Sequence, residues 1–227
     1  MIFDDSSIDT TILIINSYYK NNTRKINYFK SLNNTGGPAF GRNWGIVNGS
    51  GKYVCFLDAD DFWLSDKINI QINFLEKNNY TFCGAQCIVV GSKQFPNIYG
   101  EISIFSQFTR NKFSLSSLMF RRDCLIANNL YFDTRKDYFG VEDYELIFRL
   151  YNSGFKGYII NSFLVNYIHT SNSLSHNDLK KSEYKRILVL NNYESRNVLE
   201  NLFIKHVVIL LKIRILYYVL RDYLCKL

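Results

Sequence analysis

The stretch GRNWGIVNGSGKYVCFLDADDFWLSDKINIQINFL, residues 41–75, decides how this chain is expected to fold. At its centre, the apolar run KYVCFL has the composition of a buried strand. The residues before and after this run are predicted to form helices. Three carboxylates, those of Asp58, Asp60 and Asp61, follow directly after the predicted strand. This strand end is therefore the first place to expect a binding site.

The rest of the chain continues the alternation of strands and helices. Helices are predicted for residues 10–21, 39–48, 65–77 and 142–154. Further strands are predicted for residues 2–3, 26–32, 81–90, 114–120 and 156–168. Strands joined by helices of this length indicate right-handed crossovers, so the fold class is α/β with a mostly parallel (mixed) sheet flanked by helices. In such a sheet, ligands bind beyond the carboxyl ends of the strands.

The composition indicates one globular domain followed by a tail. The chain has 227 residues, of which 47% are hydrophobic, and only two are prolines. We expect the domain to cover residues 1–176 and a basic, apolar helical tail to cover residues 177–227. The five cysteines are odd in number and scattered, which favours free thiols in a reducing compartment, the cytoplasm.

The tail carries most of the positive charge. From residue 178 onward, ten Lys and Arg stand against five Asp and Glu, which accounts for +5 of the net charge of +7. Charged residues interrupt the apolar runs well before the ~20 residues that a bilayer span requires. Two interpretations stay open: a helix lying on the inner face of the cell membrane, or a helix packed on its own domain. No recognisable nucleic-acid-binding module accompanies this charge.

The acidic cluster itself predicts a cation site. Neighbouring carboxylates repel one another, so keeping Asp58, Asp60 and Asp61 ionised calls for a counter-cation. Hard oxygen ligands at this spacing suit Mg²⁺ or Mn²⁺, especially where phosphate oxygens complete the coordination. One of the three could instead cap the helix that follows. An EF-hand is a poor alternative because Trp63 stands where its loop needs Gly. A metal-dependent phosphatase is also disfavoured, since Phe62 stands where Thr or Val is usual.

Four segments together resemble the family 2 glycosyltransferases, which have the GT-A fold. Residues 41–75 resemble the centre of that family, where a Gly-rich turn, an Arg-Asn helix start, a strand and a D-x-D motif follow one another. Upstream, IFDDSSIDTT resembles the nucleoside-binding strand end. Downstream, GVEDYELIFRL resembles the E-D motif and YIHTSNS the later histidine segment. The resemblance extends over residues 2–175.

The resemblance implies a reaction and a catalytic residue. It implies an inverting transfer of a sugar from a nucleotide-diphosphate sugar to a surface-glycan or lipid-linked acceptor. Asp143 matches the catalytic base that removes the proton of the acceptor hydroxyl. Glu142 beside it would orient the acceptor.

The resemblance also implies a donor and metal site. Asp5 is placed at the nucleotide base, and Asp58 at the ribose or a metal-bound water. Asp60 and Asp61 are the candidates for binding the metal and phosphates, and His169 is a third metal candidate. Arg42 could contact the nucleotide or simply pair with a neighbouring acid, and a lone histidine such as His169 is more often structural.

One departure from the family bears on activity. Its members normally begin with an earlier strand and helix, whereas this chain begins at the second strand. We therefore expect one of three cases: the first residue given lies after the true start of the protein, the chain is a truncated remnant, or another chain supplies the strand. A non-catalytic remnant or a sugar-nucleotide-binding subunit is the alternative function.

Overall fold

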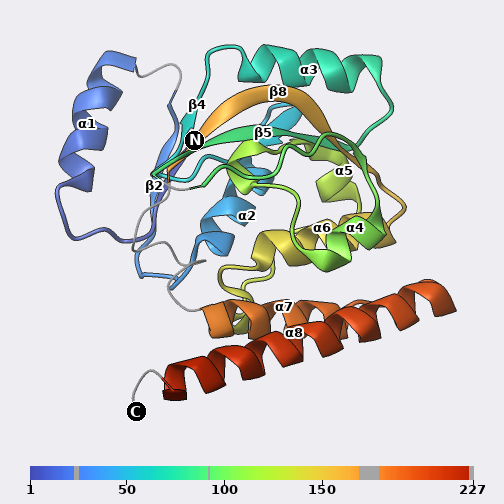
Figure 1. Ribbon diagram of the computed structural model, residues 1–227. Helices are drawn as coiled ribbons and strands as arrows, with labels where there is room; N and C mark the ends of the chain where they lie inside the picture. Colours follow the sequence, from blue (N-terminus) through green and yellow to red (C-terminus); the bar gives the residue numbers. More distant parts are fainter. Residues whose placement is uncertain (23–25, 92, 169–178, 225–227) are drawn as a thin grey trace.

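The computed structural model describes residues 1–22, 26–91, 93–168 and 179–224. A central mixed sheet separates a single helix on one side from several helices on the other, and two long helices form an outer layer beyond them (Figure 1). The GT-A-like α/β class predicted from the sequence agrees with this arrangement.

The main sheet has six strands. They are β3 (Tyr53–Cys55), β4 (Phe62–Trp63), β5 (Phe82–Val90), β6 (Gly100–Ile102), β7 (Met119–Arg121) and β8 (Gly157–Ile168). Their order is β3-β7-β5-β8-β4, with β6 also paired to β8. The pairing of β5 with β8 is parallel, and the other four pairings are antiparallel.

This sheet is more antiparallel than the strand and helix alternation predicts. Two of the four antiparallel pairings come from β7, which lies between β3 and β5, and the other two from β4 and β6 at β8. Met119 and Phe120 of β7 are buried, and Phe120 packs on Phe56 and Phe82. An interior position covers both side chains, which an edge position would leave partly in water.

The N-terminal strands form a sheet of their own. β1 (Ile2–Asp4) and β2 (Tyr28–Lys30) pair in parallel, and α1 (Thr11–Asn22) connects them. Phe3 stacks on Phe29 and lies against Trp44 of α2 (Pro38–Asn48), which anchors the pair to the rest of the molecule. Among the described residues, β1 pairs with β2 and not with β3. The expected absence of an earlier strand and helix stays a prediction.

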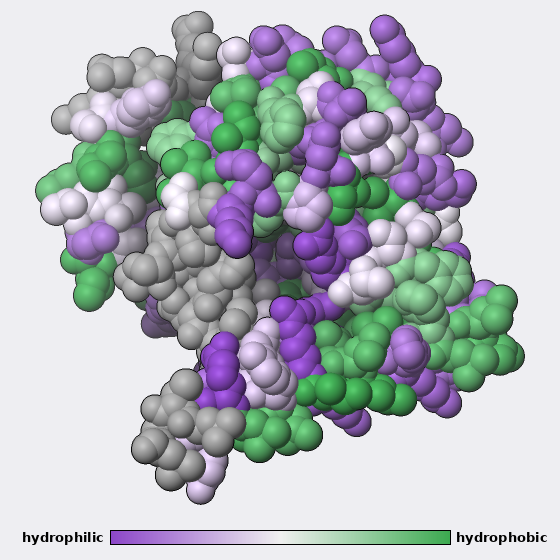
Figure 2. Space-filling model, viewed as in Figure 1, coloured by the Kyte–Doolittle hydropathy of each residue, from purple (hydrophilic) through white to green (hydrophobic). Residues whose placement is uncertain are grey.

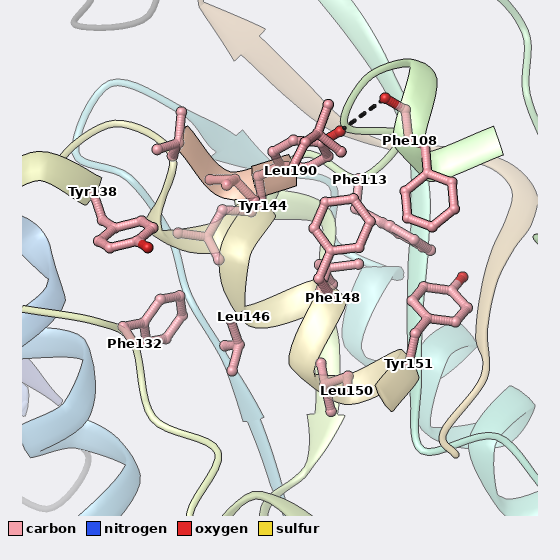
Figure 3. Packing of buried hydrophobic residues seen from close by; sticks show 14 of the residues in the cluster. Phe108, Phe113, Phe132, Tyr138, Tyr144, Leu146, Phe148, Leu150, Tyr151 and Leu190 are labelled. Carbon is pink, nitrogen blue, oxygen red and sulfur yellow. Dashed lines mark hydrogen bonds between the residues drawn. The ribbon is translucent and has the colours of Figure 1, made fainter. Parts of the chain in front are cut away.

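The remaining helices cover the main sheet. α3 (Lys67–Lys77) lies on one face (Figure 1). The helical elements on the other side are α4 (Ile104–Thr109), the short turns Leu115–Ser117 and Lys136–Tyr138, α5 (Arg122–Ala127) and α6 (Glu142–Asn152). α6 is the centre of the core: Phe148 stacks on Phe108 with the ring centroids 5.4 Å apart, and the hydroxyl of Tyr144 donates a hydrogen bond to the carbonyl of Phe108 at 3.3 Å (Figure 3).

The tail contains α7 (Leu179–Asn192) and α8 (Val198–Leu224). One face of α8 is buried on the domain through Ile204, Val207, Val208, Leu211, Ile215 and Tyr218. Packing on its own domain, one of the two interpretations of the tail, is thus observed for this face. Within the described ranges, no helix is long and apolar enough to cross a membrane.

Candidate active site

A cavity of about 710 Å³ lies between the main sheet and α7. The strand end after β3 contributes Asp58 and Asp60, α2 contributes Arg42, and the start of α6 contributes Glu142 and Asp143. Five of the residues predicted from the sequence therefore line one cavity. Hydrophilic side chains gather around a recess between the upper part of the molecule and the tail helices (Figure 2).

Arg42 connects the strand end to α6. Its guanidinium donates to Asp58 Oδ1 at 2.9 Å and to Glu142 Oε1 at 2.5 Å. The second oxygen of Glu142 accepts the backbone N–H of Gly140 at 2.5 Å. Pairing with neighbouring acids, the simpler alternative for Arg42, is thus what the structure shows. The ion pair between Glu142 and Arg42 connects α6 to α2. The predicted part of Glu142 in orienting the acceptor stays a prediction.

Asp143 has the most perturbed environment of the group. Its pKa is raised to about 7: burial is the largest cause, the negative charge of Glu142 acts in the same direction, and the charge of Arg42 opposes the shift. The carboxylate still reaches the cavity, so it is poised to accept a proton near neutral pH.

A relay of amide side chains fixes the orientation of Asp143. Asn111 donates to Asp143 Oδ2 at 2.9 Å, and Gln107 donates to Asn111 Oδ1 at 2.8 Å. The amide oxygen of Gln107 accepts the backbone N–H of Lys112 at 3.1 Å. Gln107 is fully buried. Sequence reasoning missed this relay, because neither amide belongs to a motif or a periodic pattern.

The three aspartates after β3 lie in different environments. Asp60 is exposed and lines the cavity, and Asp58 is half-buried beside Arg42. Asp61 is 5% exposed and accepts the backbone N–H of Ile168 at 3.0 Å. Its other oxygen has no hydrogen-bond partner among the described residues, and burial raises its pKa.

This donor set fits a divalent ion in part. Within the described ranges, no three His, Cys, Asp or Glu side chains converge on one point. Asp58 and Asp60 nevertheless present carboxylate oxygens to the cavity. Mg²⁺ and Mn²⁺ commonly bind such oxygens together with the phosphate oxygens of a substrate. The orphaned oxygen of Asp61 is a further hard donor, although the carboxylate is turned toward β8. His169 lies outside the described residues, and the metal roles of Asp60, Asp61 and His169 stay predictions.

Asp5 lines a second cavity of about 630 Å³ between β1 and β3. This cavity shares Arg42 and Asp58 with the first one. Asp5 accepts the backbone N–H and the hydroxyl of Thr35, both at 2.9 Å, and these bonds hold the turn before α2. Its predicted contact with a nucleotide base stays a prediction.

Comparison with protein families matches this chain to one family. The model of the family described as "Glycosyl transferase family 2" matches residues 1–133. A glycosyltransferase of Rickettsia felis is 48% identical over 82 residues, 36% of this chain and 13% of the relative. One of Haemophilus influenzae is 31% identical over 135 residues, 55% of this chain and 51% of the relative.

An Escherichia coli relative has a named reaction. The enzyme WfaP, a UDP-Glc:alpha-D-GlcNAc-diphosphoundecaprenol beta-1,3-glucosyltransferase, is 39% identical over 84 residues, 36% of this chain and 31% of the relative. The chain thus spans about half the length of the Haemophilus relative, and less of the other two.

Solved structures share the fold. The Staphylococcus aureus protein TarS, residues 1–349 in complex with UDP, superposes with a TM-score of 0.68 at 17% identity, over 91% of this chain and 60% of that one. GalNAc-T7 with UDP, GalNAc and Mn²⁺ gives a TM-score of 0.60 at 12% identity, over 83% of this chain and 40% of that one. These likenesses establish the GT-A fold.

Proposed function

Because the chain belongs to glycosyltransferase family 2, we propose that it transfers a sugar from a nucleotide-diphosphate sugar to a lipid-linked or surface-glycan acceptor. The observation that carries the proposal is Asp143, a carboxylate with a pKa raised to about 7 that lines a cavity beside Arg42 and Asp58. A reaction that deprotonates an acceptor hydroxyl needs such a group at the acceptor side.

Each cavity residue has one part in the proposed reaction. Asp143 accepts the proton of the acceptor hydroxyl as that oxygen attacks the anomeric carbon. Arg42 and Asp58, which line both cavities, hold the donor where the two cavities meet, and Asp5 contacts its base. With a single base and no separate nucleophile assigned, the transfer is one displacement that inverts the anomeric carbon.

A divalent ion, Mg²⁺ or Mn²⁺, belongs to this proposal. Asp60 would hold it together with phosphate oxygens of the donor, and Asp61 and His169 are the further candidates. When bound, such an ion stabilises the negative charge that develops on the departing diphosphate. The fit of Asp58 and Asp60 to hard cations supports this part of the proposal.

Peripheral contact with the inner face of the cell membrane is proposed for α8. Opposite its buried face, α8 exposes a row of apolar side chains, namely Leu202, Ile209, Ile213, Leu216, Tyr217 and Leu220. At 100° per residue, Lys205 and Lys212 fall along one edge of this row, and Arg214 and Arg221 along the other. An apolar stripe with basic edges suits an anionic lipid surface, whose acyl boundary takes the stripe and whose headgroups take the charges.

The test is turnover of nucleotide sugars. The purified chain is incubated with UDP-glucose and Mn²⁺, and release of UDP is compared between the wild type and Asp143→Asn. We expect release that depends on Mn²⁺ and is lost in the variant. Binding of UDP in calorimetry without any turnover would favour the sugar-nucleotide-binding subunit instead, and equal turnover by the variant would overturn the role of Asp143.

A further inference from the structure

Three basic side chains line the active-site cavity on the side of Asp143. Arg110 and Lys112 stand on either side of Asn111, the residue that donates to Asp143. Arg186 reaches the same cavity from α7. These three residues, here called the basic wall, have no part in the proposed reaction.

Two of these charges lack a counter-charge. Neither Arg110 nor Lys112 forms an ion pair with a carboxylate of the described residues; the ammonium of Lys112 bonds only to the hydroxyl of Thr109, at 3.1 Å. Burial lowers the pKa of Lys112, and the like charges of Arg110 and Arg186 lower it further. A bound anion would reverse both effects, because it neutralises charges that now repel one another.

Arg186 is held in place but is not fully satisfied. It donates to the carbonyl of Thr109 and pairs with Glu183 at 2.5 Å. Glu183 also pairs with Arg214 at 3.0 Å, so one carboxylate serves two guanidinium groups. The Nε atom of Arg186 is buried without a hydrogen-bond partner among the described residues. A positive charge that Glu183 does not fully compensate therefore remains at this wall.

We propose that Arg110, Lys112 and Arg186 form a subsite for the phosphate or diphosphate group of the acceptor. The inference rests on the proposed function, because Asp143 marks the acceptor side. Asn111 lies between Arg110 and Lys112 in the chain and donates to Asp143, the proposed catalytic base. An acceptor sugar linked to a diphosphate would therefore contact the subsite and Asp143 at the same time. The exposed aromatic side chains of Phe95 and Phe163 line the same cavity and offer faces on which a sugar ring can stack.

The donor diphosphate is the competing source of the same chemistry. None of the three basic residues lines the cavity between β1 and β3, which contains Asp5, and both cavities share Arg42 and Asp58 instead. The donor diphosphate is thus expected near Arg42 and Asp58. The phosphate or diphosphate group of the acceptor is expected to bind the basic wall instead.

Calorimetry with two soluble probes tests the subsite. Geranyl diphosphate represents the acceptor anion, and UDP the donor. In the double variant Arg110→Gln/Lys112→Gln, the affinity for geranyl diphosphate should fall by at least about tenfold, since two charge-assisted hydrogen bonds are lost. The affinity for UDP should stay within about twofold, a change too small to reflect a lost ion pair. The control Lys77→Gln/Lys136→Gln removes the same charge from exposed positions and should change neither affinity.

Other results overturn the inference. Absence of geranyl diphosphate binding to the wild type, or unchanged binding to the double variant with an unchanged melting curve, removes the subsite. An equal loss of UDP affinity assigns the basic wall to the donor. If the double variant melts early, Lys112→Gln alone replaces it, with the same expected direction. Failure of the wild type to bind UDP counts against the proposed function and leaves the geranyl diphosphate result standing.

Discussion

The two cavities meet at Arg42 and Asp58, but they are built from different parts of the chain. The cavity of Asp143 is lined by ionised side chains of opposite sign, together with aromatic rings. The cavity between β1 and β3 is lined by consecutive residues along the edge of β3 and by one face of α2, including Gly41 and Gly45. Charge therefore determines what the cavity of Asp143 can bind, whereas backbone shape and free volume determine what the cavity between β1 and β3 can bind.

The largest expected effect is on the charge side, at Asp143. Replacing it with Asn keeps the size but removes the proton acceptor, so kcat should fall by about a thousandfold. Binding of UDP should be unchanged. The matched control is Asp66→Asn, at the exposed start of α3, where the side chain makes no capping bond. If Asp66→Asn lost as much activity as Asp143→Asn, the contrast between the two carboxylates would disappear.

The pH profile sharpens the same contrast. Because the base must be ionised, kcat should fall about tenfold per unit as the pH drops below about 7, the pKa of Asp143. The stability of the folded protein depends on pH with the opposite sign. From pH about 4 to about 7 the folded protein retains a proton at Asp143 that the unfolded chain has released, so stability decreases as the pH rises.

Thermal melting checks that sign. Asp143→Asn should melt at a higher temperature than the wild type at pH 8, and the gap should close toward pH 4. A gap that widens at low pH would contradict the assigned pKa shift.

Arg42 is the link between the two cavities, and its removal should affect both. In Arg42→Gln, the carboxylates of Asp58 and Glu142 lose their partner, and we expect a loss of roughly 2 kcal/mol in the free energy of unfolding, since Asp58 is partly screened by solvent. The pKa of Asp143 should rise, because the charge of Arg42 opposes the upward shift. Denaturant unfolding and the acid limb of kcat measure the two effects. An unmoved acid limb would contradict the electrostatic part.

The last comparison concerns volume and affects stability alone, and two glycines of α2 provide a matched pair. A Cβ at Gly41 would lie 2.6 Å from Phe3, whereas a Cβ at Gly45 meets nothing within 4 Å. Gly41→Ala should destabilise the protein by about 1–3 kcal/mol. Gly45→Ala should stabilise it by about 0.5–1 kcal/mol through helix propensity. Urea unfolding compares them; equal changes would show that β1 does not rest on α2 as described.

The sequence predicts the charged residues of the cavity of Asp143 better than it predicts the features that depend on the shape of the fold. Five residues of the cavity of Asp143 could be predicted because strand ends and helix starts have recognisable local patterns. They are Arg42, Asp58, Asp60, Glu142 and Asp143. The orientation of Asp61 depends on its bond to Ile168, a residue 107 positions away, and no local pattern reports such a contact. The place of β7 between β3 and β5 was missed for the same reason, since pairing order follows from burial across the whole sheet. The basic wall likewise joins α7 to the segment after α4 only in three dimensions.

The shared carboxylate of Glu183 determines where this protein can be shortened. Its two partners lie on different helices, Arg186 on α7 and Arg214 on α8. A chain ending before α8 would lose Arg214 and leave the full charge of Glu183 facing Arg186, besides uncovering the apolar groups beneath. The outermost helix does not line the cavity, but through Arg214 and Glu183 it sets the charge around Arg186, which does. Removing α8 to improve expression would therefore change the electrostatics that an activity assay measures.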